Sequence, residues 1–217
     1  MDNDSRWSSF GSVQMQPSAS SPWPHTIWGG SVALLSKRTN RYDSDVSTAD
    51  TIAVLRRLAH TYSGHASVIA AVTQALSGGG AGSQRDIACA IFHWVRTNVH
   101  FVDDETILYE QLGIPLEDLD KELLIVPPVL LAMPNPQGDC DDFSLLLASM
   151  LLCAGLKPYY VTVAADPTDP QKFSHIYVCV QLADEGGYLA LDAGNRLAMV
   201  PPGWESNKVT RKAIWAV

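Results

Sequence analysis

The chain has 217 residues, of which 47% are hydrophobic and 18% are charged, enough for one domain with a full core plus a tail. Its formal net charge is −8 and its basic residues are scattered, whereas a nucleic-acid-binding surface requires clustered lysine and arginine. The start Met-Asp-Asn-Asp does not resemble a signal peptide, and no apolar run approaches the ~18 residues of a membrane span. We therefore expect neither nucleic acid nor a membrane among its partners.

The four cysteines are not arranged for a zinc knuckle or a thioredoxin-type site, because no two of them form a Cys-x-x-Cys pair. Cys89, Cys153 and Cys179 lie inside apolar patterns and are expected to be core thiols. Reduced thiols are typical of cytosolic proteins, so we expect a cytoplasmic protein. The fourth cysteine, Cys140, stands in the polar sequence Gly-Asp-Cys-Asp-Asp.

The N-terminal part divides into an arm and a helical region. Residues 1–46 are predicted to be an extended or partly disordered arm, because their first half is rich in Ser, Pro and Gln and can bury little. Residues 47–217 are predicted to form the folded domain. It should open with three helices: one from Ser47 to an interruption at Gly64, one that ends at Gly78, and one from a capping-box pattern at Ser83–Asp86 to about Val99.

Residues 103–137 are rich in proline and are predicted to be irregular, with one short helix at Val129–Met133. A stretch of this length without regular structure is usually functional. This stretch and the loop Asp166–Lys172 are expected to rim a cleft, because they precede Cys140 and His175 in the sequence.

The C-terminal half predicts a central helix followed by an antiparallel sheet. The helix, Asp141–Leu152, is apolar on nearly all sides and should be buried. Three strands should follow, at Tyr159–Ala165, Ser174–Leu182 and Tyr188–Asp192, with a hairpin-like turn between the last two. This order of elements predicts an α+β domain.

Cys140 is a candidate nucleophile because it should occupy the first position of the central helix. Asp139 is a good N-cap residue, and Asp142 follows at the third helical position. A helix N-terminus stabilises a thiolate, and the Cys140 backbone N–H could form one arm of an oxyanion hole. Three neighbouring aspartates oppose the thiolate, an effect that an imidazolium partner would outweigh.

Two other interpretations of this sequence are a packed core thiol and a calcium or magnesium loop. The polar surroundings of Cys140 are a poor place to bury a thiol. The acidic residues run straight into a helix and lack the alternating ligand spacing of an EF-hand. We therefore expect no metal and no cofactor.

His175 and Asp192 complete a candidate Cys-His-Asp set. His175 shares one strand face with Tyr177 and Cys179, and Asp192 lies near the end of the next strand. In antiparallel neighbours the two side chains can meet and fix the imidazole tautomer. These are the parts of a cysteine hydrolase or acyltransferase. The remaining histidines, His25, His60, His65, His93 and His100, are predicted to be surface or helix residues.

From Thr48 to Asn195 the sequence resembles the transglutaminase-like superfamily of papain-fold cysteine enzymes, in its bacterial and phage branch. The resemblance is carried by Ile-Phe-His-Trp-Val-Arg-Thr-Asn-Val at 91–99, Glu-Leu-Leu at 122–124 followed by Pro127, Gly-Asp-Cys-Asp-Asp-Phe at 138–143, Phe-Ser-His-Ile-Tyr-Val at 173–178 and Leu-Asp at 191–192. It implies a papain-like core with helices packed on an antiparallel sheet. It also implies Cys140 as nucleophile, His175 as general base and acid, and Asp192 as the residue that orients the imidazole.

The resemblance leaves the reaction open, because the superfamily includes peptidases, transglutaminases, deamidating enzymes and inactive members. Tyr109–Asp120 is longer than this branch usually shows, and the second oxyanion donor is not evident; Gln137 and Asn135 are the candidates. The first hypothesis is a cysteine peptidase or amidohydrolase that acts on a protein or peptide. The alternatives are a transglutaminase or deamidase acting on protein glutamine, and a phage structural or assembly protein, which would be virion-associated. The oligomeric state is left open.

Overall fold

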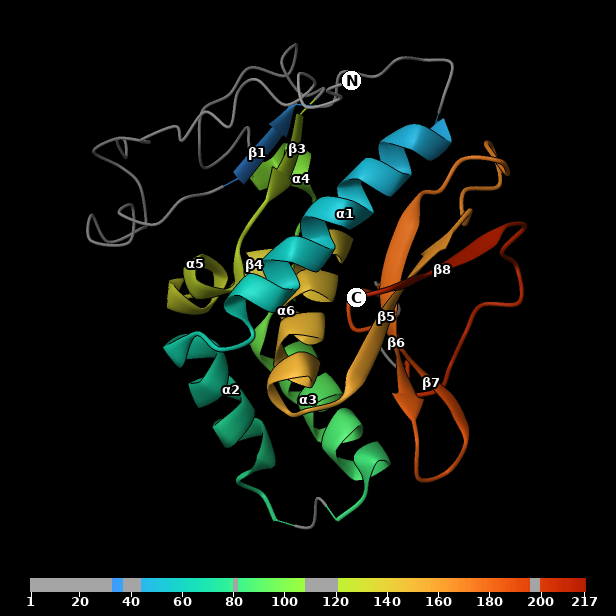
Figure 1. Cartoon of the computed structure of the whole chain (residues 1–217). Helices are drawn as coiled ribbons and strands as arrows, with labels where there is room; N and C mark the ends of the chain where they lie inside the picture. The colour runs from blue at the N-terminus through green and yellow to red at the C-terminus, as the bar shows by residue number, and fades with distance from the viewer. Residues whose placement is uncertain (1–32, 37–43, 80–81, 108–120, 196–199) are drawn as a thin grey trace, which may run out of the picture.

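The computed structural model describes residues 33–36, 44–79, 82–107, 121–195 and 200–217 (Figure 1). Its helices are α1 (Ser44–Tyr62), α2 (Ala66–Leu76), α3 (Gln84–Asn98), α4 (Asp104–Thr106), α5 (Pro127–Ala132) and α6 (Cys140–Cys153). Its strands are β1 (Ala33–Ser36), β2 (His100–Phe101), β3 (Lys121–Leu124), β4 (Gln137–Gly138), β5 (Lys157–Val163), β6 (His175–Leu182), β7 (Gly187–Leu191) and β8 (Lys212–Ala216). The fold is α+β, as the sequence predicts. None of the helices within these ranges is long and apolar enough to cross a lipid bilayer.

The main sheet has the strand order β7-β6-β5-β8, and every neighbouring pair is antiparallel. The three predicted strands are confirmed as β5, β6 and β7. The sequence prediction missed β8, which pairs with β5 at the edge opposite β7. Strand β8 is half exposed, with alternating exposed and half-buried residues, so its sequence carries no strong apolar signal.

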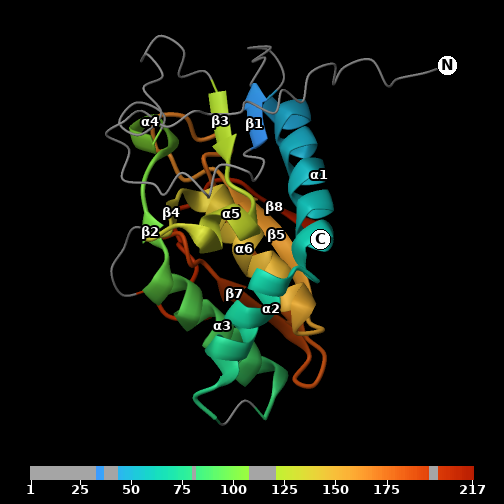
Figure 2. The same cartoon turned by 90° about the vertical axis from the view of Figure 1, so that its left-hand side faces the viewer.

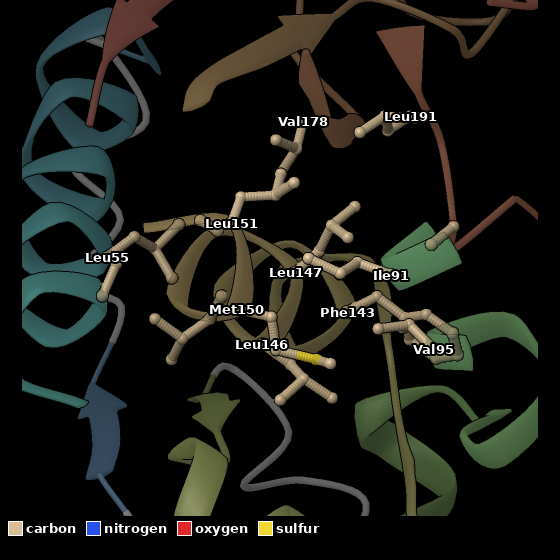
Figure 3. Close-up of a cluster of buried hydrophobic side chains, with 14 of the residues drawn as sticks. Leu55, Ile91, Val95, Phe143, Leu146, Leu147, Met150, Leu151, Val178 and Leu191 are labelled. Atoms are coloured by element: carbon tan, nitrogen blue, oxygen red, sulfur yellow. The ribbon is translucent and has the colours of Figure 1, made fainter. Parts of the chain in front are cut away.

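Helix α6 forms the centre of the core and is buried almost all round, as predicted. Figure 2 shows helices α1, α2, α3 and α5 on one side of it, with the sheet behind. The close-up in Figure 3 shows side chains from α1, α3, β6 and β7 converging on the apolar side chains of α6; those on the helix are Phe143, Leu146, Leu147, Met150 and Leu151. Each such side chain contributes about 1.5–3 kcal/mol when fully buried, so this packing dominates the stability of the domain.

Local signals place the starts of α3 and α6 where the sequence predicts them. Ser83 and Asp86 form a complete capping box at the start of α3. Asp139 and Asp142 do the same at the start of α6, where the Asp142 carboxylate accepts the Asp139 N–H. The other Asp142 oxygen accepts the Ile125 N–H at 2.7 Å, which ties the first turn of α6 to the segment that follows β3.

The segment 103–137 is less irregular than the sequence predicts. Its described part contains α4, β3, α5 and β4, while residues 108–120 lie outside the described residues. Helix α5 starts at Pro127, two residues before the predicted helix, because proline is well tolerated in the first turn, where its missing N–H is not needed. Strand β3 pairs with β1, which lies inside the predicted N-terminal arm. Helix α1 begins at Ser44, three residues before the predicted domain boundary.

The two faces of the main sheet have different environments. One face packs on α6, and the other carries a small apolar cluster of Val161, Val163, Tyr177, Cys179 and Ala190. The connection from β7 to β8 crosses this second face, where its Val209 packs on the cluster (Figure 1). The Gly203 N–H donates to the Ala190 carbonyl of the edge strand β7, and the Thr210 N–H donates to the Ala164 carbonyl just after β5. We call this second face the outer face.

The contact between Gly138 and Asp142 gives a prediction for stability. A Cβ added at Gly138 would lie 2.4 Å from an Asp142 carboxylate oxygen and 2.7 Å from its Cβ. We expect Gly138→Ala to lower the free energy of unfolding by about 1–3 kcal/mol, because the first turn of α6 must shift to admit the methyl group. Urea denaturation measures this. A Cβ at Gly64 would meet nothing within 4 Å, so Gly64→Ala is the control and should not destabilise the protein. Equal stability of the two variants would contradict the tight packing at Gly138.

Candidate active site

The structure brings His175 and Asp192 into direct contact, as the sequence predicts. The His175 Nε2 lies 2.9 Å from Asp192 Oδ1. The register pairs Val178 with Leu191, so Asp192 stands beside Tyr177 and diagonal to His175 on the outer face. The carboxylate side chain is only 5% exposed, whereas the imidazole is 19% exposed. Because a carboxylate can only accept a hydrogen bond, Nε2 carries the proton and Nδ1 is the nitrogen left for a reacting group.

Cys140 is the first residue of α6, and its turn packs against the ends of β6 and β7. The Ser144 hydroxyl donates to the Cys140 carbonyl at 2.7 Å and lies 3.3 Å from the carbonyl of Ile176, the residue after His175. A Cβ built on Gly194 would lie 3.2 Å from the Cys140 Cα, so the backbone just past Asp192 touches the backbone of Cys140. The three predicted residues therefore come from chain segments that are in contact.

Asp192 is held in place by residues that the sequence prediction missed. The Asn195 side-chain amide donates to the second Asp192 oxygen at 2.8 Å. Arg96 of α3 in turn donates to the carbonyls of Asn195, at 3.1 Å, and Ala193, at 3.4 Å. The spacing of three residues between Asp192 and Asn195 was a usable signal, because such a turn lets an amide reach back to a carboxylate. The contact that Arg96 makes from α3 joins residues far apart in the sequence, and no sequence pattern indicates it.

The two proposed oxyanion donors occupy different positions. Gln137 lies in β4 and is half-buried, three residues before Cys140. Asn135 is exposed in the loop before β4. Strand β4 pairs in parallel with β2, which fixes the Gln137 backbone beside His100. Both assignments remain predictions.

The acidic surroundings of Cys140 are less negative than the sequence suggests. Asp142 is fully buried, and its pKa is raised well above the ordinary 3.8, first by burial and then by the nearby Asp139 and Asp104. With its raised pKa, Asp142 opposes the Cys140 thiolate less than an ordinary carboxylate in the same place would.

One group of carboxylates has a spacing that a cation could use. Oxygens of Asp104, Asp139 and Asp142 lie within 4.8 Å of one another. Both Asp142 oxygens, however, already accept backbone N–H groups from Ile125 and Asp139. The closeness of these acids contributes to the raised pKa of Asp142. The expectation that the site holds no metal stays a prediction.

A cavity of about 480 Å³ opens on the outer face beside the His175–Asp192 pair. Its opposite wall is formed by Trp204, Glu205 and Lys212, from the connection to β8 and from β8 itself. None of the described residues of 103–137 or 166–172 lines this cavity, and neither does Cys140. The predicted rims of a cleft at Cys140 therefore stay a prediction. The wall at Trp204 and Glu205 forms because the connection from β7 to β8 crosses the sheet. This is a long-range contact that no local sequence pattern indicates.

The other thiols and histidines differ from the candidate residues. Burial raises the pKa of Cys179 to about 11 and also raises the pKa of Cys89 and Cys153. Cys179 is buried, as predicted, while Cys89 and Cys153 are half-buried at the edge of the core. Among the other histidines, four are exposed as predicted and His25 lies outside the described residues; the four are His60, His65, His93 and His100.

Comparisons with known proteins include a distant structural similarity. No protein-family model matches the chain, and no curated protein matches it. A solved structure described as a crystal structure of a TGase is 16% identical with a TM-score of 0.39, over 78% of this chain and 38% of that chain. The present chain thus spans well under half the length of that protein. A similarity this distant does not fix a family, so the function is inferred from the site itself.

The raised pKa of Asp142 predicts a pH-dependent stability. The folded protein binds this proton more tightly than the unfolded chain does, so the associated stability is complete below about pH 3.8 and is lost as the pH rises through the raised folded pKa. Asp142→Asn lacks this titration. We expect wild type to lose free energy of unfolding relative to Asp142→Asn as the pH rises from 4 to 8, with a slope of at most ~1.4 kcal/mol per unit. A difference that stays constant in urea titrations at several pH values would contradict the assignment.

The arrangement also predicts selective alkylation of Cys140. At mildly acidic pH, iodoacetamide should modify Cys140 well before the other three cysteines, because burial keeps those three protonated. Asn195→Ala should shift the pH profile of this alkylation, since it removes the amide bond to Asp192 and loosens the imidazole. Mass spectrometry of peptides gives the rates, and Asn207→Ala, an exposed asparagine, is the control. Equal labelling of all four cysteines would remove the case for a nucleophile.

Proposed function

We propose that the protein is a cysteine hydrolase that cleaves an amide bond in a protein or peptide through an acyl-enzyme on Cys140. The observation that carries this proposal is the His175–Asp192 hydrogen bond, made at strand ends that touch the first turn of α6. The transglutaminase-like sequence pattern supports the same assignment of roles. Asn195 and Arg96 act as positioning residues for Asp192.

The proposed chemistry assigns one role to each of the three side chains. His175 takes the Cys140 proton on Nδ1, and the thiolate attacks the amide carbonyl carbon. In this mechanism the carbonyl oxygen, now negative, is stabilised by the Cys140 N–H and the dipole at the N-terminus of α6. His175 then protonates the leaving amine as the C–N bond breaks. A water molecule, deprotonated by His175, attacks the thioester and restores the Cys140 thiol.

Asp192 supports the imidazole in both of its protonation states. As an acceptor it fixes the tautomer with the proton on Nε2, and as a buried anion it stabilises the imidazolium that forms in each half-reaction. Its second oxygen is satisfied by Asn195, so the carboxylate is held on two sides. A buried charge held this way costs less to maintain than an unpaired one.

Hydrolysis and transamidation share the acyl-enzyme, and one experiment separates them. A glutamine-containing peptide is incubated with the protein, with and without a primary amine, and its mass is followed. Chain cleavage indicates a peptidase, a gain of ~1 Da indicates deamidation, and incorporation of the amine with loss of ~17 Da indicates a transglutaminase. We expect cleavage. The absence of any change over a panel of peptides would favour a binding or assembly role.

Variants test the roles of the three residues in the same assay. Cys140→Ala and His175→Ala should each lower kcat by about a thousandfold or more, and Asp192→Asn should lower it less, since it retains the geometry. Cys153→Ala, at the other end of α6, is the control and should retain activity. Turnover that survives Cys140→Ala would rule out the acyl-enzyme on this residue.

A further inference from the structure

The wall of the cavity opposite the His175–Asp192 pair is built around one carboxylate. Glu205 Oε1 accepts hydrogen bonds from the Tyr177 hydroxyl on β6 and from the Lys212 ammonium on β8. These two bonds hold the connection to β8 against the outer face. The Tyr177 ring also stacks on the His175 imidazole, with ring centroids 6.2 Å apart and planes 27° apart. Tyr177 therefore contacts both this wall, through Glu205, and His175, the candidate general base.

The two charged side chains of this wall balance each other, because Glu205 is paired with Lys212. Burial would raise the pKa of Glu205, but the bonds from Lys212 and Tyr177 outweigh it and its pKa is lowered, so the carboxylate is ionised at neutral pH. A charged ligand group would be attracted by one of these two side chains and repelled by the other. A neutral group that both donates and accepts hydrogen bonds fits this balance.

Glu205 and Lys212 have hydrogen-bonding capacity left over. Among the described residues, the two hydrogen bonds to Glu205 both end on Oε1, so Oε2 can accept another donor. The Lys212 ammonium has three donors, of which one points to Glu205. The two side chains are 43% and 36% exposed and can be reached from the cavity. In an extended peptide the N–H and C=O of one residue point to the same side, which matches an acceptor and a donor placed next to each other.

The position of the cavity indicates which part of the substrate it holds. The acyl group is bonded to the Cys140 sulfur, whereas the leaving amine receives its proton from His175. The described lining includes His175 and does not include Cys140. A leaving amine that receives its proton from His175 would therefore lie toward this cavity.

We propose that this cavity binds the substrate backbone beyond the scissile bond, with Glu205 Oε2 accepting the N–H and Lys212 Nζ donating to the C=O of the second residue on the leaving side. The proposal rests on the proposed acyl-enzyme at Cys140. It makes the substrate an extended peptide that continues past the cleavage site, recognised by its backbone and not by a charged side chain.

The test uses the reverse half-reaction, which does not require the natural substrate. p-Nitrophenyl acetate acylates Cys140 and releases nitrophenolate, and an added amine can then compete with water for the acetyl group. In this step the amine nitrogen bonds to the acetyl carbon, the C–S bond breaks, and the surplus amine proton passes through His175 to the sulfur. The measured quantity is the ratio of acetylated amine to acetate for each amine.

Two amines are compared as acetyl acceptors, and they differ in the second residue, which the cavity should bind. Glycylglycinamide has the N–H and C=O of a second residue, whereas glycinamide has a similar amino group and lacks the second C=O. We expect the wild-type protein to transfer acetyl to glycylglycinamide about tenfold more efficiently. Glu205→Gln and Lys212→Met should each reduce this preference about three- to tenfold, the usual effect of losing one hydrogen bond.

Three comparisons keep the test specific. Lys208→Met removes an exposed lysine of the same connection outside the cavity lining and should leave the preference intact. Lys212→Arg retains donors and should retain most of the preference even if Lys212→Met loosens the segment. Equal transfer to both amines in wild type, or a preference that survives both Glu205→Gln and Lys212→Met, would overturn the inference. Absence of a nitrophenolate burst, or a burst that persists in Cys140→Ala, would instead overturn the proposed function and the inference with it.

Discussion

Burial of α6 on all sides is the constraint on which the candidate site depends. Its apolar side chains cannot leave the core without exposing a large surface to water, so the helix can neither slide nor rotate. The helices and the sheet that enclose it therefore fix its first turn at the ends of β6 and β7. Asp142 adds a polar anchor there through its bonds to Ile125 and Asp139. Cys140 owes its place beside Ile176 and Gly194 to this packing.

The alternation of side chains along β6 divides the sheet between stability and chemistry. Ile176 and Val178 point into the core against α6, while His175 and Tyr177 lie on the outer face. Because the period of a strand is two residues, a shift of register by one would move the histidine into the core. The apolar residues of β6 thus hold the imidazole on the cavity side, and the antiparallel pairing with β7 brings Asp192 to it.

Features determined by nearby residues were predictable from the sequence, and features determined by distant ones were not. The capping box at Asp139 and Asp142, the buried helix behind it and the meander that pairs His175 with Asp192 all follow from local patterns. Strand β8 and the wall at Glu205 depend on a chain crossing over two strands, and only the packing of that connection on the outer face reveals them. The pairing of β1 with β3 is non-local in the same way.

Under the proposed function, the strength of the contacts in the cavity on the outer face bears on whether the acyl-enzyme is hydrolysed or transferred to an amine. Water and the leaving peptide compete for the same thioester, so a peptide that is held firmly would react back before it dissociated. Glu205 and Lys212 are each more than a third exposed, and bonds to such groups compete with solvent. They can orient a peptide and still release it. Release clears the side of His175 from which water must approach, and this favours hydrolysis as the outcome.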